Sequence, residues 1–355
     1  MKKTTIATAL AVTAALGACS AEDRADYVLH YATYGAAGSD QSQTVVEWAE
    51  RVEERSGGRI EVRFHYSQSL VSADDSLAAT LDGRVDMAHI GSIYYASDLP
   101  MFTVAELPFE ARNTEAYMTA VHRMYVENEE FAADFDRNNV RPLFPLPFGN
   151  IVLGLNQPAE TPRDLAGRSI RTGGLVAEVL LDVGGNPVAM TANDIYESLE
   201  RGVIDGYTSL AMSNLNSFGV SGSTPYLVDP GIGISASSVV VINSDVYESM
   251  PEDLRRVIDE TSDEAIGTGL EYMDTEAAAA CETLVANGTE FAKFSEDEVT
   301  AWKEAGTVAE DWVSRNEDRG YDAESVLSDF RALVAEESEK SDYVDPIASC
   351  VEENL

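Results

Sequence analysis

Residues 164–206 restrict the fold more than any other part of the sequence. The first strand of this stretch is expected to end at Arg171, and a helix follows it until Gly184-Gly185. A second strand, a second helix and a third strand then complete the stretch up to Gly206. This order predicts parallel strands joined by helices, and ligands bind beyond the carboxyl ends of such strands. Arg171 and the residues after Gly206 are therefore placed for binding a small molecule.

The same order occurs nearer the N-terminus. Residues 27–31, 60–66 and 85–90 read as strands, with helical patterns between them. The helix end, capping glycine and strand at residues 81–86 recur in type at residues 200–205, where Asp205 is expected to fix a strand end. We therefore predict two α/β lobes with mainly parallel sheets, helices on both faces and a cleft between the lobes.

Two motifs carry a resemblance to a known family: D-L-A-G-R-S-I-R, which ends at Arg171, and E-S-L-E-R-G-V-I-D-G, which ends at Gly206. They resemble the solute-binding proteins of tripartite ATP-independent periplasmic (TRAP) transporters, the DctP-like family. The resemblance covers nearly the whole chain from Tyr27 onward. It implies a two-lobed periplasmic binding protein fold with a long C-terminal helix bracing both lobes. It also implies a receptor, not an enzyme, that delivers a small organic solute to a membrane permease without a cofactor.

The chain is expected to cross between the lobes twice. Lobe I comprises residues 26–149 and about 237–270, and lobe II comprises residues 150–236 and about 271–355 with the C-terminal helices. Almost nothing breaks the helical pattern between Pro251 and about Asn287, and such a helix would span on the order of 50 Å. A last helix is expected from about Asp322 to Cys350.

Arg171 is the principal candidate for ligand binding, because a guanidinium matches a carboxylate with two parallel hydrogen bonds. The alternative is an internal ion pair. The resemblance places further residues at the cleft: Tyr34, Asp74, Ser92, Asn150 and Ser209. Their positions in the sequence add His89 at a strand end, Tyr94 among the aromatic residues, and Tyr207 after Gly206.

The likeness has two departures. Asn150 stands where carboxylate-binding relatives often carry a second arginine, and Ser209 stands where many carry an asparagine. These departures put a dicarboxylate or a sialic acid in doubt. We favour a small monocarboxylate held by Arg171, with hydroxyl groups of Tyr34, Tyr207 and Ser209 completing the site.

Other functions remain open. A small amine or amino alcohol could be held by aromatic rings and by Asp74, Glu106 and Glu110. A periplasmic hydrolase would need a nucleophile and a base, but the sequence contains no G-x-S-x-G, H-E-x-x-H or P-loop motif. A receptor for a sensor kinase is a further alternative.

The charge of the chain limits its partners. It carries 62 acidic and 24 basic residues and a formal net charge of −38. Nucleic acid and anionic membrane surfaces repel such a chain, so neither is expected as a partner.

The cysteines indicate the compartment. Residues 1–19 read as a signal peptide with the lipobox L-G-A-C, so we expect lipid attachment at Cys19 or, alternatively, plain cleavage near Ala21. The protein would then be periplasmic, with only a lipid anchor in the membrane. Cys281 and Cys350 are expected to form a disulfide in this oxidising compartment, or else to be two buried thiols. No metal-ligand spacing occurs, and no metal site is expected.

Overall fold

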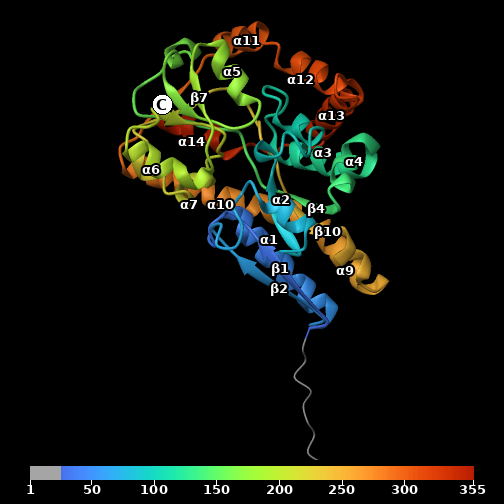
Figure 1. The fold of residues 1–355 in the computed structure, drawn as a ribbon. Helices are drawn as coiled ribbons and strands as arrows, with labels where there is room; N and C mark the ends of the chain where they lie inside the picture. Colours follow the sequence, from blue (N-terminus) through green and yellow to red (C-terminus); the bar gives the residue numbers. More distant parts are fainter. Residues whose placement is uncertain (1–24) are drawn as a thin grey trace, which may run out of the picture.

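The computed structural model describes residues 25–355, so the signal peptide and Cys19 lie outside the described residues. Two sheets organise the two lobes, with strand orders β2-β1-β3-β10-β4 in lobe I and β11-β9-β5-β8-β6-β7 in lobe II (Figure 1). The strands are β1 (Tyr27–Ala32), β2 (Ile60–His65), β3 (Met87–Gly91), β4 (Val140–Leu146), β5 (Leu153–Leu155), β6 (Ser169–Arg171), β7 (Asn186–Val188), β8 (Gly206–Tyr207), β9 (Tyr226–Asp229), β10 (Ser238–Asn243) and β11 (Glu290–Lys293).

Helices cover both sheets. The α-helices are α1 (Asp40–Ser56), α2 (Ser76–Leu81), α3 (Thr114–Glu127), α4 (Glu129–Arg137), α5 (Val176–Asp182), α6 (Ile195–Glu200), α7 (Asn214–Ser217), α8 (Ser244–Ser249), α9 (Glu252–Ser262), α10 (Ala265–Ala286), α11 (Glu296–Ala305), α12 (Val308–Glu317), α13 (Ala323–Ser338) and α14 (Pro346–Asn354). The 3₁₀ helices are η1 (Ser92–Tyr94), η2 (Phe102–Glu106), η3 (Pro162–Leu165), η4 (Ala192–Asp194) and η5 (Ser221–Ser223).

The two sheets repeat one arrangement, which confirms the two-lobed α/β prediction. In lobe I, β1 lies between β2 and β3 and is parallel to both. In lobe II, β6 lies in the same way between β7 and β8. An antiparallel strand follows in each case, β10 beside β3 and β5 beside β8. The sheets are therefore mixed, with parallel strands where the predicted β-α-β order occurs.

Equivalent aspartates hold the two central strands. The Asp86 carboxylate accepts a hydrogen bond from the backbone N–H of His30 at 2.8 Å. In lobe II, the Asp205 carboxylate accepts one from the backbone N–H of Ser169 at 2.8 Å. Each aspartate therefore fixes the neighbouring strand, because it binds a backbone donor that the ladder leaves free. The predicted strand ending at Asp205-Gly206 is wrong in its bounds, because β8 begins at Gly206, after Asp205.

Helix α1 shows how the sequence sets local structure. Ser39 caps its first turn by accepting a hydrogen bond from the Ser42 N–H, and Gly57 ends it with a φ of 67°. Val45, Trp48 and Val52, at helical spacing, are buried against the sheet of lobe I.

The predicted long helix is wrong in its length, because a turn interrupts it at Asp263-Glu264 between α9 and α10. The hydroxyl groups of Thr261 and Ser262 donate to carbonyls four residues earlier, a pattern that bends helices. Helix α10 alone still braces both lobes, because it packs against α1 of lobe I and against α7 of lobe II. Figure 1 shows α10 crossing between the two lobes.

The C-terminal region also differs from the prediction. The last helical stretch consists of two helices, α13 and α14, because Asp345 caps a new helix that Pro346 begins. Helix α13 packs on α3 of lobe I, although the prediction assigned it to lobe II. In Figure 1, α11, α12 and α13 form an arc from α5 of lobe II to α3 of lobe I.

The disulfide prediction is confirmed. Cys281 and Cys350 are bonded, with their Cα atoms 6.0 Å apart, and the bond ties α14 to α10. Within residues 25–355, no helix has the length and apolar character needed to cross a membrane.

Candidate functional site

A cavity lies between the lobes, beyond the carboxyl ends of β1, β3, β6 and β8. Its volume is about 280 Å³. The lobes are closed around this cavity, because lobe II donates hydrogen bonds to lobe I beside it. The lining residues are Tyr34, Gln41, Ile93, Tyr94, Phe148, Arg171, Ala192, Ser209, Leu210, Asn214 and Phe218.

Arg171 is the charged residue of the cavity wall, and its side chain is 0% exposed. Its Nε donates to the carbonyl of Met190 at 3.2 Å, and its Nη1 donates to the carbonyl of Thr208 at 3.1 Å. A longer bond of 3.4 Å joins Nη1 to the carbonyl of Ser209. The remaining nitrogen, Nη2, is buried without a partner in the described part of the chain.

No carboxylate of residues 25–355 forms an ion pair with Arg171, although the charge of Asp194 and the side chain of Tyr94 lie close enough to favour the charged guanidinium. Burial nevertheless lowers the pKa of Arg171 from its ordinary value. A buried cation that lacks a partner is costly, and an anionic ligand would remove that cost.

Ser209 shapes the cavity wall beside Arg171. Its backbone is left-handed, with a φ of 58°, at the turn where two successive carbonyls meet the guanidinium. Its hydroxyl bonds the hydroxyl of Thr172 at 3.1 Å and accepts from the N–H of Gly173 at 3.4 Å. Ser209 therefore holds the loop that follows β6.

Tyr34 forms the facing wall in lobe I. Its ring stacks on the ring of His89 with centroids 4.0 Å apart, and its hydroxyl bonds the hydroxyl of Ser238 at 3.3 Å. Burial lowers the pKa of His89 to about 3, so this imidazole is neutral and backs the ring of Tyr34.

Hydrogen bonds across the cavity connect the lobes. The Ala192 N–H of lobe II donates to the Tyr94 hydroxyl of lobe I at 3.3 Å. The side-chain amide of Asn193 donates to the carbonyl of Tyr34 at 3.3 Å. These bonds exist only when the lobes are closed, which makes the cavity a product of closure.

The comparisons agree with this architecture. A model of DctP, described as bacterial extracellular solute-binding protein, family 7, matches residues 31–313. The chain belongs to this family. It is a TRAP solute-binding protein, and the prediction from the two motifs is confirmed.

Similar proteins bind different solutes. The receptor is 26% identical to a TRAP solute-binding protein of Rhodoferax ferrireducens solved with copurified benzoate; the match covers 88% of this chain and 99% of that one, with a TM-score of 0.80. It is 24% identical over 261 residues to a monocarboxylate 2-oxoacid-binding periplasmic protein of Nostoc sp., covering 70% and 69% of the two chains. It is 22% identical over 281 residues to the ectoine-binding periplasmic protein TeaA of Halomonas elongata, covering 76% and 80%.

Four of the predicted site residues line the cavity of the receptor: Arg171, Tyr34, Tyr94 and Ser209. His89 lies behind Tyr34. The prediction of hydroxyl contacts fits less well, because the hydroxyl groups of Tyr34 and Ser209 already bond Ser238 and Thr172.

Four other predicted residues do not line the cavity. Tyr207 points into the core of lobe II, where its ring packs against Gly154 and its hydroxyl bonds Thr224 at 2.8 Å. The reason is that successive strand residues face opposite sides of the sheet, and the hydroxyl finds a buried partner on the core side.

The other three predicted residues, Asn150, Ser92 and Asp74, form hydrogen bonds outside the cavity. The Asn150 N–H donates to Asp345 at 2.8 Å, and its side-chain amide donates to the carbonyl of Arg112. Ser92 accepts from the Ser237 N–H at 3.1 Å. Asp74 is exposed and accepts from the hydroxyl of its neighbour Ser72.

Seven lining residues were not among the predicted site residues: Gln41, Ile93, Phe148, Ala192, Leu210, Asn214 and Phe218. Gln41 lies in the first turn of α1, which follows β1. The sequence could have indicated its place in the cavity, because the first turn of such a helix lies near the carboxyl edge of the sheet. Asn214 and Phe218 reach the cavity only through the path of the chain after β8, which the sequence pattern does not reveal.

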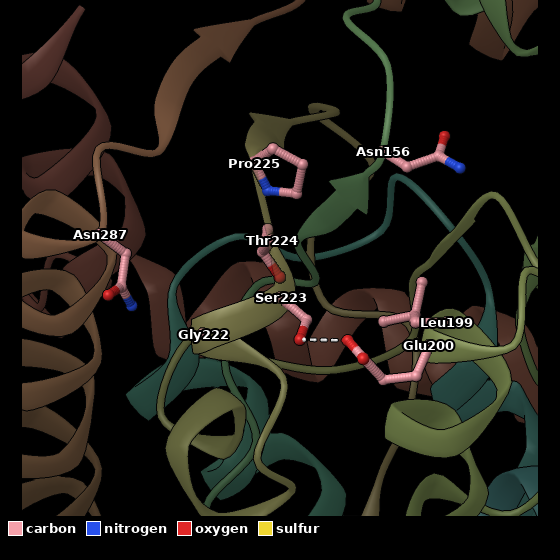
Figure 2. A pocket seen from close by; sticks show the side chains of 8 residues that line it. All are labelled: Asn156, Leu199, Glu200, Gly222, Ser223, Thr224, Pro225 and Asn287. Atoms are coloured by element: carbon pink, nitrogen blue, oxygen red, sulfur yellow. Dashed lines mark hydrogen bonds between the residues drawn. The ribbon is translucent and has the colours of Figure 1, made fainter.

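A separate hollow on lobe II, between β5, α6, η5 and the end of α10, is drawn in Figure 2. Its side chains include Glu200, which accepts a hydrogen bond from the Ser223 hydroxyl at 3.1 Å. Unlike the cavity between the lobes, it presents no buried cation. Across the described chain, no group of three or more His, Cys, Asp or Glu side chains is arranged to hold a metal ion.

Proposed function

We propose that this protein is the extracytoplasmic receptor of a TRAP transporter for a small organic anion with one carboxylate group. Arg171 binds the carboxylate, and the closed complex delivers the solute to the membrane permease. The observation that carries this proposal is the burial of Arg171 with a free Nη2 and with no carboxylate partner among residues 25–355.

The electrostatics favour an anion over a cation. Backbone carbonyls orient the guanidinium but carry no net charge, so a solute carboxylate would supply the missing counter-charge. Because the cavity closes around this pair, the interaction takes place with little water present and is strengthened accordingly.

The other walls favour an apolar, ring-shaped solute body. Tyr34, Tyr94, Phe148 and Phe218 supply aromatic surfaces, and Ile93, Leu210 and Ala192 supply aliphatic ones. The Rhodoferax relative was solved with benzoate, a solute of this kind. We therefore propose an aromatic or similarly compact monocarboxylate.

A small amine fits the site less well. Of the three carboxylates considered for it, Asp74 is exposed, Glu110 pairs with Arg331, and Glu106 bonds the backbone of Leu175. None of them lines the cavity, whereas Arg171 does. The hydrolase reading finds no support in the family either, because its members are solute-binding receptors.

The receptor is proposed to act in the periplasm, attached through a lipid at Cys19. The lipobox supports this placement. Mass spectrometry of the mature protein tests it: a lipid-modified Cys19 at the N-terminus is the expected result, and an unmodified N-terminus near Ala21 would overturn it.

The ligand class is tested by pairs of compounds that differ only in charge. Thermal unfolding is measured with benzoate and benzamide, with mandelate and mandelamide, and with matched amines. At about 100 times its dissociation constant, a true ligand stabilises the folded protein by about 2.7 kcal/mol. We expect the carboxylates to raise Tm and their amides to leave it unchanged. A rise with the amines alone would refute the proposal.

A further inference from the structure

A second hollow adjoins the solute cavity at the lobe interface, and Ile93 lines both. Glu106 of lobe I and Gly174, Leu175 and Glu178 of lobe II also line it. Ile93 packs directly on lobe II, because a Cβ added to Gly173 would lie 2.8 Å from its Cδ1. This hollow therefore lies next to the strand end that carries Arg171.

Glu106 reaches from lobe I to lobe II at this place. Its side chain is 1% exposed, and its Oε2 accepts a hydrogen bond from the Leu175 N–H at 3.2 Å. Gly174 makes the approach feasible: a Cβ there would collide with Oε2 and would lie 2.8 Å from Cδ. Its Oε1 is buried and has no well-formed hydrogen bond in the described chain, although the Ser92 side chain lies close enough to favour the ionised carboxylate.

The contact bears on the solute site because of where Leu175 lies. The loop from Thr172 to Leu175 directly follows Arg171, and the hydroxyl of Ser209 holds its middle at Gly173. Glu106 of the opposite lobe thus accepts a hydrogen bond from Leu175, at the end of the same loop. In the closed arrangement, Glu106 is buried against this loop.

No cation pairs with Glu106, although Arg315 and Arg319 line the same hollow. Glu178 on α5 adds a second negative charge, and it pairs with Arg315 of α12 at 2.8 Å. Arg319, in the turn after α12, donates to the carbonyl of Ser97, and Tyr117 of α3 donates to the carbonyl of Ala105. On α13, Arg331 pairs with Glu110. An ionised Glu106 would be buried with only neutral hydrogen bonds, at high cost.

We propose that Glu106 is a positioning residue for solute capture: it closes onto the Gly174–Leu175 backbone as a neutral carboxylic acid, so capture takes up one proton. This inference rests on the proposed function for its solute. Its physical basis is that the open lobes leave the carboxyl group in water, where it ionises, whereas the closed lobes exclude water from it.

The sign of the pH dependence follows from this difference. Burial raises the pKa of Glu106 from an ordinary value of 4.5 to about 8 in the closed structure. Between these values the closed form holds a proton that the open form lacks. Solute affinity therefore falls as pH rises through this window, by about tenfold per pH unit at its steepest, and becomes constant above about pH 8.

The first test is calorimetric titration with benzoate, which stays ionised, at intervals from about pH 6 to about pH 9. In the native protein the affinity is expected to fall with rising pH, whereas Glu106→Gln is expected to bind with little pH dependence. Gln keeps an acceptor for the Leu175 N–H but cannot titrate. The control Glu178→Gln removes the neighbouring carboxylate and should keep the fall. Equal pH profiles for the native protein and Glu106→Gln would overturn the proposal.

A second pair of variants tests the contact without changing any charge. Gly174→Ala and Gly202→Ala both place alanine at a left-handed backbone, with φ values of 61° and 66°. Only Gly174→Ala collides with Glu106, because nothing lies within 4 Å of a Cβ at Gly202. We expect benzoate affinity to drop for Gly174→Ala alone. Equal affinity in both variants would contradict a role for the contact.

A measurement of lobe closure in the protein without solute distinguishes a failure of this inference from a failure of the proposed function. Small-angle X-ray scattering of the unliganded protein should show a smaller radius of gyration at pH 6 than at pH 9, and no such change for Glu106→Gln. If benzoate does not bind at any pH, the proposed ligand fails and the scattering alone decides on Glu106. A radius that is independent of pH in the native protein would then overturn the inference.

Discussion

The two lobes use equivalent strand positions for opposite chemistry. Ala32 ends β1 and pairs with Ala88 of β3, and Arg171 ends β6 and pairs with Tyr207 of β8. In both lobes the next residue donates its N–H to the outer parallel strand, Thr33 to His65 and Thr172 to Val188. Lobe I therefore presents a methyl group where lobe II presents a guanidinium.

This difference divides recognition between the lobes. Lobe II supplies the charge, through Arg171 and the carbonyls that orient it. Lobe I supplies shape, through the ring of Tyr34 and the neutral His89 behind it. Under the proposed function, a solute gains both kinds of contact only when the lobes close, so its binding would favour closure.

The lobes also differ in covalent support, because the disulfide Cys281–Cys350 lies in the core of lobe II. We expect the double variant Cys281→Ser, Cys350→Ser to lose about 4 kcal/mol of unfolding free energy, because the bond closes a loop with a sequence separation of 69. Urea unfolding measures the loss, and reducing agent should destabilise the native protein but not the variant. Hydrogen exchange should rise in α14 more than in α1; equal rises would contradict the assignment of this crosslink to lobe II.

Removal of the charge from lobe II should have the largest effect on binding. Arg171→Ala is expected to weaken carboxylate binding by about 3 kcal/mol, or roughly 100-fold, because it leaves the solute carboxylate buried without its partner. Titration calorimetry measures the loss. The control is Arg168→Ala on the same segment, whose guanidinium bonds the carbonyls of Gln157 and Pro158 away from the cavity. Similar losses in both variants would mean that general stability, and not the cavity, explains the effect.

In lobe I, the ring of Tyr34 should contribute more to solute affinity than its hydroxyl group does. Tyr34→Ala is expected to lower affinity by about 1.5 kcal/mol, or about tenfold, because a buried apolar surface of the cavity is lost. Tyr34→Phe should lower it less than about twofold, since the hydroxyl bonds Ser238 within lobe I. Titration calorimetry measures both affinities. A large loss of affinity in Tyr34→Phe would show that the hydroxyl contacts the solute.

The smallest expected effect concerns Asp40, a buried carboxylate of lobe I that faces Asn214 of lobe II at 3.5 Å. Burial raises its pKa from 3.8 to about 6, so its ionised form opposes closure increasingly as pH rises between these values, and constantly above them. Asp40→Asn should therefore bind benzoate a few-fold more tightly at pH 7, with an advantage that shrinks toward pH 4.5. An advantage that does not change with pH would refute this interpretation.

Local patterns predicted much of the fold and part of the site. The β-α-β order and the place of Arg171 at the end of a strand follow from short-range spacing. The break between α9 and α10 did not, because Thr261 and Ser262 are compatible with a helix until their hydroxyl groups bond the backbone. Tyr207 was misplaced because the strand was expected to end at Gly206, whereas β8 includes Tyr207, and the face that Tyr207 occupies depends on the register with Gly154.

The sequence by itself determined the class of protein, the two-lobed repeat, the cationic residue of the cleft and the pair of cysteines available for a disulfide. Only the tertiary structure decided which side chains meet across the lobes, such as Asn214 with Asp40 and Glu106 with Leu175. These contacts join residues 174 and 69 positions apart, and no periodic pattern encodes them. Burial then sets their chemistry, because a carboxyl group acquires a raised pKa only where the folded chain excludes water from it.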